Sequence, residues 1–227
     1  MHFQLEFSSV SATKKVYFSK SNLYWDGSAF KFETNQYDDL SSSTHITHFY
    51  WSKDPAIACA ETYRDEDADV SDVLFTNATE TAANSDYTVN GVTGIYRSLS
   101  IAEWQYLFNT RTMTNGKDRF SNYITGGVTI ESKKYYGLFL YPDDYSGDVV
   151  SNSMTWAEIN AAGIVFLRAS GSRVGFDIDL PNTLGGVLSS SAFDKSHSCI
   201  VYFADKDVYI DYTNNRSFAF SVRLITE

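Results

Sequence analysis

The stretch that decides the fold reads RSLSIAEWQYLF and runs from residue 97 to residue 108. Ser100 followed by Glu103 is a capping box, because the hydroxyl can accept a hydrogen bond from the third helical N–H while the carboxylate reaches back to the backbone. We expect the helix to begin there and to end near Arg111. Its apolar side chains fall on one face: Trp104, Leu107 and Phe108.

A second capping box, Thr155 to Glu158, predicts a short helix that stops at Gly163. Between two aromatic runs, Asp26-Gly27 predicts a hairpin turn. Runs of alternating or continuous apolar residues predict short strands, at 16–18, 22–25, 30–33, 164–167, 200–203, 208–210 and 218–224. The sequence therefore predicts an α+β fold with two short capped helices and small antiparallel β-sheets, in a single domain over residues 1–227.

The composition limits the classes of partner that we expect the chain to bind. Hydrophobic residues make up 43% and aromatic residues 16% of the chain, which is enough for a packed core. The formal net charge of -10 opposes contact with phosphate backbones, so we expect no nucleic-acid partner. We also expect no membrane insertion and no signal peptide in the given chain, since it contains neither an apolar run of about 20 residues nor a basic leader.

Catalytic and metal-binding motifs are weak. His45 and His48 stand three apart in a predicted extended segment and lack the spacing of a zinc site, so we expect no metal there. His2 and His197 are further candidate bases, but no Gly-x-Ser-x-Gly elbow accompanies them. The acidic run 64–72 could hold calcium through carboxylate oxygens, although it lacks the EF-hand spacing. We favour a solvated loop there and expect no cofactor.

Other polar and glycine motifs have ordinary explanations. Asp143-Asp144 and the pair Asp177 and Asp179 could do acid–base work on a glycoside, but carboxylates are common on an acidic surface. Gly126-Gly127 and Gly185-Gly186 lack a phosphate-binding pattern, so we expect turns.

The order of these motifs resembles one branch of a known fold. Residues 97–107 resemble the capped Glu-Trp helix of formylglycine-generating-enzyme-like proteins with the C-type lectin fold. Residues 163–173, which end Ala169-Ser170-Gly171-Ser172-Arg173, resemble the strand and turn that follow in those proteins, and residues 220–224 resemble their last strand. With residues 10–20, the chain resembles the Bacteroidetes and gut-phage group that includes variable proteins of diversity-generating retroelements.

The resemblance implies a binding protein and not an enzyme. The formylglycine-generating enzyme uses a close pair of cysteines, which Cys59 and Cys199 cannot match. Variable proteins bind ligands through a diversified C-terminal region, here residues 186–224. Val187-Leu188 stand where the family usually has Tyr-Trp, which indicates either core drift or diversification.

The codon chemistry of that family fits this region. An AAC or AAT codon altered at its adenines never encodes Lys, Glu, Gln, Met or Trp, and from Gly186 to Val222 only Lys195 and Lys206 belong to those types. We expect these two lysines to be fixed among variable positions. Strand alternation would put Tyr209 and Asp211 on one face. The expected contact residues are Gly186, Val187, Leu188, Phe193, Asp194, His197, Cys199, Tyr209, Asp211, Tyr212 and Phe218.

The expected function is receptor binding at a phage tail tip (the virion surface) or a bacterial cell surface, with a protein or glycan of a host or neighbouring cell as partner. Two alternatives stay open: a structural adhesin or pilus subunit of the same fold, and an enzyme related to formylglycine-generating enzymes.

Overall fold

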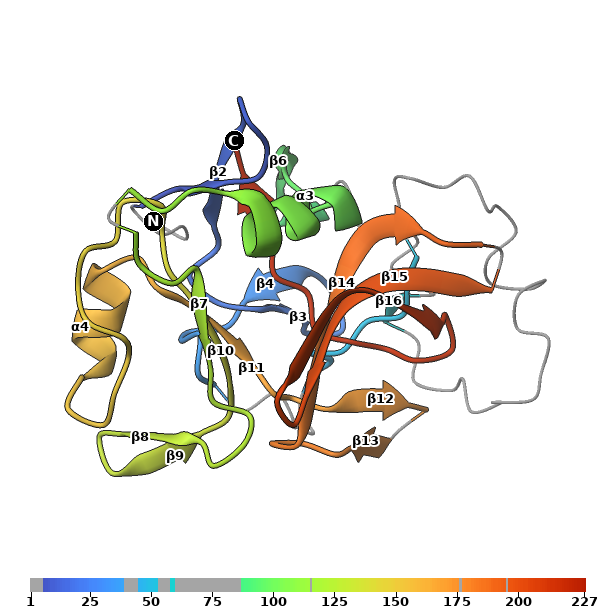
Figure 1. Cartoon of the computed structure of the whole chain (residues 1–227). Coiled ribbons are helices and arrows are strands. Elements are labelled where there is room, and N and C mark those ends of the chain that lie inside the picture. Colours follow the sequence, from blue (N-terminus) through green and yellow to red (C-terminus); the bar gives the residue numbers. More distant parts are fainter. Residues whose placement is uncertain are drawn as a thin grey trace.

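The computed structural model of the chain describes residues 6–38, 45–52, 58–59, 87–114, 116–175, 177–194 and 196–227. The predictions for His2, for the acidic run 64–72 and for Lys195 lie outside these ranges. Within them, short strands form six small sheets and helices are few, a mixed architecture that agrees with the α+β expectation (Figure 1).

Both predicted helices are present, and both begin at their capping boxes. Helix α3 (Ile101–Gln105) is capped by Ser100, whose backbone N–H donates to Glu103 Oε2 at 2.8 Å. It continues as the π-helix η1 (Tyr106–Thr110), which Arg111 terminates as predicted. Helix α4 (Trp156–Ala161) is capped in the same way by Thr155. The chain then turns at Gly163, which has a φ of +68°.

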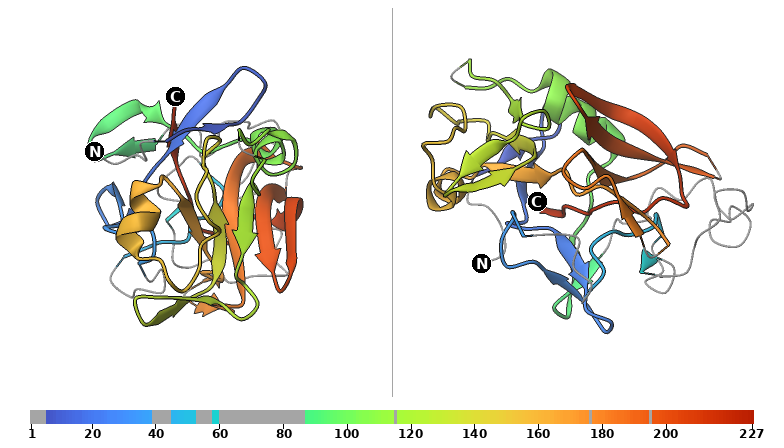
Figure 2. Two further views of the ribbon diagram at one scale, coloured as in Figure 1. Left: turned by 60° about the vertical axis from the view of Figure 1, so that its left-hand side comes forward. Right: turned by 90° about the horizontal axis from the view of Figure 1, so that it is seen from below.

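One end of the molecule is built around α4. The rings of Phe139, Trp156 and Phe166 form its core, with centroids of Phe139 and Phe166 4.5 Å apart. Figures 1 and 2 show this end on the far side of the molecule from the strands formed by residues 184–215. Its strands, in the sheet β11-β10-β7 and the hairpin β8-β9, are β7 (Phe120–Asn122), β8 (Val128–Ile130), β9 (Lys133–Tyr135), β10 (Gly137–Leu140) and β11 (Val165–Arg168).

Two further sheets, ordered β1-β2-β17 and β3-β4-β5-β6, are built from strands of the N-terminal half, except that β17 comes from the last residues of the sequence. The hairpin predicted at Asp26-Gly27 joins β3 to β4 in antiparallel register. Strands β4 and β5 pair in parallel, whereas the sequence predicts antiparallel sheets only. The strands are β1 (Ser8–Ser9), β2 (Lys15–Phe18), β3 (Leu23–Trp25), β4 (Phe30–Phe32), β5 (Tyr87–Val89), β6 (Val92–Tyr96) and β17 (Ile225–Thr226).

The predicted strand 218–224 is not a regular strand. Ala219, Phe220 and Ser221 each form a single bridge, to Arg173, Phe49 and Val187 respectively. A regular β-strand pairs with one partner strand over several residues, whereas successive residues of this segment pair with different parts of the chain. It therefore runs through the centre of the molecule, where Phe220 is fully buried.

The C-terminal sheet has the order β14-β15-β16 and is the longest-stranded sheet described. It contains β14 (Leu184–Ala192), β15 (His197–Ala204) and β16 (Asp207–Asn215), and the hairpin of β12 (Ser172–Val174) with β13 (Asp177–Asp179) lies beside it (Figure 1).

The glycine pair at the start of β14 does not form a turn, contrary to the sequence expectation. A Cβ on Gly185 would lie 2.2 Å from the ring of Phe203, and one on Gly186 would lie 2.2 Å from the ring of Phe220. The two glycines therefore let aromatic rings pack directly against the strand backbone. By contrast, Gly126 and Gly127 do lie in a bend with positive φ, as predicted.

Candidate ligand-binding surface

The C-terminal sheet separates two hydrophobic cores. Val187, Val201 and Phe203 pack on the side of Trp104 in α3, whereas Leu188 and Ile200 pack on the side of Phe220. A strand buried on both faces tolerates few polar residues, so exposed side chains are confined to the turns and to β16.

Three predicted contact residues lie in these cores. Val187 is 1% exposed and Leu188 is not exposed at all, and the Cα of Gly186 is covered by Phe220. Because strand alternation sends Val187 into one core and Leu188 into the other, none of the three is displayed. This corrects the expectation that they belong to the surface, and it favours the interpretation of Val187-Leu188 as core residues.

Cys199 is also buried, which corrects the expectation of an exposed side chain there. Burial, and secondly the charge of Asp211, raises the pKa of its thiol. Burial likewise raises the pKa of Cys59 to about 12. Both thiols are therefore protonated at neutral pH, and a protonated thiol is a poor nucleophile.

Tyrosine rings gather on one face of β15 and β16. Tyr209 is 47% exposed and Tyr212 is 40% exposed, and both lie next to Tyr202. The centroids of Tyr202 and Tyr212 are 4.7 Å apart in a stacked arrangement, and Tyr209 lies 6.2 Å from Tyr202 and 6.1 Å from Tyr212. We call Tyr202, Tyr209 and Tyr212 the tyrosine cluster.

A β-bulge creates this cluster. Ile200 pairs with Tyr212 but Tyr202 pairs with Tyr209, so β16 has one residue more than β15 between these pairs. The extra residue reverses the alternation and brings Tyr212 to the same face as Tyr209. Asp211 instead acts on Cys199, on the other face of β15. The expectation that Tyr209 and Asp211 share a face is therefore wrong.

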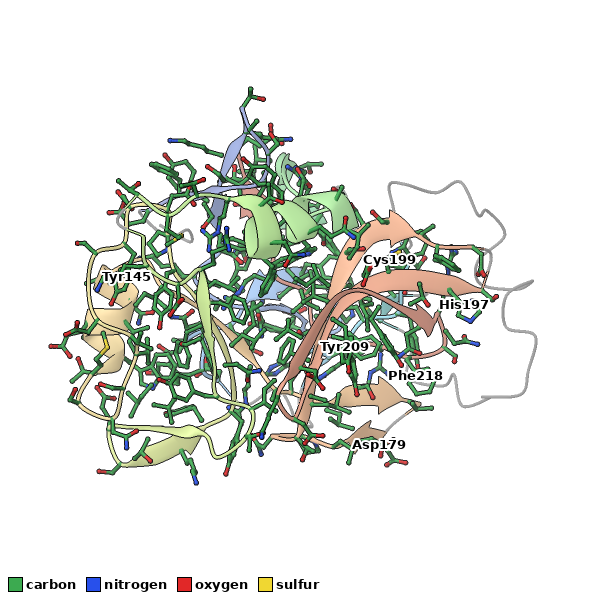
Figure 3. All side chains as sticks on the ribbon, viewed as in Figure 1. Tyr145, Asp179, His197, Cys199, Tyr209 and Phe218 are labelled. Carbon is green, nitrogen blue, oxygen red and sulfur yellow. The ribbon has the colours of Figure 1, made fainter. Side chains whose placement is uncertain are left out.

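The turn between β14 and β15 displays a second group. Phe193 is 64% exposed at the tip, and Figure 3 shows His197 where β15 begins, at the outer end of the sheet. Asp194 Oδ1 accepts from the backbone N–H of His197 at 2.7 Å and from its ring Nδ1 at 2.9 Å. Burial alone would raise the pKa of Asp194. The hydrogen bonds from His197, with one from the backbone N–H of Ser196, have the larger combined effect and lower the pKa of Asp194 to about 2.

A buried arginine holds the turn from behind. The Arg216 guanidinium donates to the carbonyl oxygens of Asp194 and His197 and lies 4.1 Å from the centroid of Trp51. Trp51 Nε1 in turn donates to the carbonyl of Ser189 at 2.9 Å. Both ends of the turn are thus tied to the core.

Phe218 differs from the other predicted contact residues. It is half buried and packs against the core that contains Phe220, below β16 in Figure 3. Its ring therefore contributes mainly to packing. The displayed residues are the tyrosine cluster, Phe193, Asp194 and His197, and we call this set the contact surface; Asp211 is exposed on the opposite face of β16.

No family model, curated protein or solved structure matches this chain.

Sequence reasoning missed two residues of this region. Tyr202 falls in the predicted strand 200–203 but not among the expected contact residues, because regular alternation does not bring Tyr209 and Tyr212 to one face beside it. Arg216 carried no signal, since a single arginine in a polar turn gives no indication of burial. Their roles depend on the bulge and on Trp51, which lies far away in sequence.

The histidine and carboxylate candidates elsewhere are tied into the structure. His45 Nε2 lies 2.7 Å from Glu33, and buried His48 contacts Thr47 and Ser170 through its two ring nitrogens. Desolvation, with the charge of Arg173, lowers the pKa of His48 to about 3. Asp143 pairs with buried Arg111 at 2.9 Å and also accepts from the N–H of Ser9.

A small pocket of about 150 Å³ lies at the α4 end, between residues 116–118 and the rings of Tyr141 and Tyr145. Figure 3 places Tyr145 at the opposite end of the molecule from His197.

Among the described ranges of the chain, no helix has the length and apolar character needed to cross a membrane.

Proposed function

We propose that this chain is a ligand-binding, receptor-binding protein of the C-type-lectin-like fold, with a diversified contact surface on its C-terminal sheet. It would act at a phage tail tip or a bacterial cell surface, on a protein or glycan of a host or neighbouring cell. The observation that carries the proposal is the gathering of three tyrosines on one face of β15 and β16, with a fourth aromatic ring, Phe193, exposed at the turn between β14 and β15.

Exposed aromatic side chains do little for the stability of a folded chain but are well suited to binding. Tyr supplies a large contact area with only two side-chain torsions to order, and its hydroxyl can bond a partner. Such residues are enriched at interfaces and at energetic hot spots. Tyr209, Tyr212 and Phe193 are therefore better explained by a partner than by packing.

The underlying strands make a suitable scaffold for variation. Val187, Val201 and Phe203 fix one face of the sheet against α3, and Leu188 and Ile200 fix the other. Substituting an exposed residue such as Tyr209 leaves these contacts unchanged. The bulge and the β14–β15 turn thus let side chains vary while the backbone stays in place.

Sequencing the locus from related isolates tests this proposal. We expect substitutions to concentrate at Phe193, Asp194, His197, Tyr202, Tyr209, Asp211 and Tyr212. We expect Val187, Leu188, Ile200 and Arg216 to stay constant in the same alignment. A near-repeat of this coding segment beside a reverse transcriptase gene would identify the source of the variation. The proposal fails if exposed and buried positions of residues 186–218 vary equally, or if variation is spread evenly over the chain.

A further inference from the structure

The rings of the tyrosine cluster are partly exposed to solvent. Tyr202 and Tyr212 are stacked with 23° between their planes, and the third ring is tilted beside them. The face of an aromatic ring is the negative part of its quadrupole, so grouped and partly exposed rings attract a cation.

Two carboxylates lie near these rings. Asp205 is in the turn between β15 and β16, Asp207 begins β16, and Tyr209 Oη donates to Asp207 Oδ2 at 3.3 Å. Both carboxylates are exposed. The charge of Asp207 is the main cause of the raised pKa of Tyr209. Burial raises the pKa of Tyr202, with smaller contributions from Tyr212 and Asp205. The rings therefore lie in a region of negative potential, and Lys206 is the one basic residue in that turn.

We propose that the tyrosine cluster, with Asp205 and Asp207, binds the guanidinium group of an arginine on a partner protein. This inference rests on the proposed function and names the partner chemistry at the same surface. A guanidinium is planar and weakly hydrated, so it can stack on a tyrosine face while its N–H groups donate to a carboxylate. A lysine ammonium can make the ionic contact without the stacking. Phosphates and acidic glycans are repelled by the same carboxylates.

A blocked tetra-arginine peptide is the probe, with the citrulline peptide of equal length as its uncharged isostere. Binding is followed at 150 mM salt by aromatic NMR shifts of the protein with labelled tyrosines. Salt at this level screens the long-range attraction of an acidic chain for any cation. We expect saturable shifts at Tyr202, Tyr209 and Tyr212, weaker binding of tetra-lysine, and no saturable shift with the citrulline peptide.

Matched variants separate local recognition from net charge. Tyr209→Leu keeps an apolar side chain but removes the ring, and we expect it to weaken tetra-arginine binding about twofold to fivefold. Asp207→Asn should weaken binding to a similar extent. The controls are Tyr17→Leu, which alters an exposed tyrosine on β2, and Asp118→Asn, which removes a carboxylate at the α4 end. We expect both controls to bind like the parent.

The inference is overturned if the citrulline peptide binds equally well, if Asp118→Asn weakens binding as much as Asp207→Asn, or if the cluster resonances do not move. The last result, with variation still concentrated on the contact surface, would leave the proposed function standing and would point to a glycan or an uncharged protein surface. If the peptide binds but substitutions among isolates are not concentrated on the contact surface, the proposal of a diversified surface fails and the arginine-binding inference is supported by itself.

Discussion

The ring of Tyr212 stacks on the ring of Tyr202, with 4.7 Å between their centroids. In a regular strand Tyr209 and Tyr212 would point to opposite faces, because side chains alternate and the two tyrosines are three positions apart. The bulge in β16 removes this conflict. The contact surface thus depends on one additional residue of the backbone as much as on the identities of its side chains.

Deleting Asp211 should keep these two rings together. The deletion leaves Tyr209 and Tyr212 two positions apart, so regular alternation places both on the face of Tyr202 and Tyr212 still pairs with Ile200. We expect the nuclear Overhauser contacts between the rings of Tyr202 and Tyr212 to persist in the deletion variant. The control is Asp211→Asn, which keeps the chain length and should also retain those contacts. Loss of the contacts in the deletion variant alone would mean that Asp211 is not the extra residue of the bulge.

The division between core and contact surface predicts unequal effects on stability. Leu188→Ala empties space in a fully buried position and should lower the free energy of unfolding by about 2–5 kcal/mol. Tyr209→Ala, on the same sheet but half exposed, should change it by less than about 1 kcal/mol. Urea unfolding measures both. Equal effects would contradict the burial pattern from which the contact surface was defined.

Gly186 should not tolerate a methyl group. A Cβ there would lie 2.2 Å from the ring of Phe220, so Gly186→Ala should lower the free energy of unfolding by about 1–3 kcal/mol through overpacking. Phe220→Leu creates room, and a double-mutant cycle should show that the two changes are less costly together than their sum. Strict additivity would show that the contact with Phe220 is not the cause.

His48 predicts acid sensitivity. Its pKa is about 3 in the folded chain and near 6.5 when unfolded, so the unfolded state binds more protons between these values. The stabilising effect of neutral His48 is complete above about pH 6.5 and is lost as the pH falls toward 3, by about 1.4 kcal/mol per pH unit. In His48→Gln the dependence of unfolding free energy on pH should be flatter by that amount. An unchanged slope would mean that His48 is not buried in the neutral form.

Arg216 should be needed for order in the β14–β15 turn. A lysine at this position has one nitrogen in place of the two, Nε and Nη2, that donate to these carbonyl oxygens, and it has no planar group to stack on Trp51. We expect Arg216→Lys to destabilise the chain by roughly 1–3 kcal/mol and to speed hydrogen exchange at the amides of Asp194 and His197. Lys206→Arg, a conservative change in the next turn, is the control. Exchange at the β14–β15 turn that stays slow in Arg216→Lys would assign its order to Asp194 alone.

Local chemistry made some parts of the fold predictable. The capping boxes at Ser100 and Thr155 act within four residues, so both helix starts follow from the sequence. The hairpin at Asp26-Gly27 is equally local. These features depend on hydrogen bonds that each segment makes with itself.

The rest depends on distant partners. Gly185-Gly186 looked like a turn, but the rings of Phe203 and Phe220 explain the glycines. Val187 and Leu188 looked like displayed residues because nothing local shows that β14 is covered on both faces. The sequence predicts two members of the tyrosine cluster, Tyr209 and Tyr212, from their side-chain chemistry. The bulge that places them beside Tyr202 cannot be predicted from composition or residue spacing.

The path of residues 219–225 constrains how the molecule can be made. Bonds from this segment reach Arg173, Phe49, Val187, Leu23 and Arg97 in succession. A ribosome delivers these residues after all of those partners, so the sheets cannot lock together before residues 219–225 have been synthesised. Contacts so far apart in sequence also slow folding. Until residues 219–225 emerge, the tyrosine-bearing strands have no finished core behind them, and a binding-competent surface arises only after that segment has been synthesised.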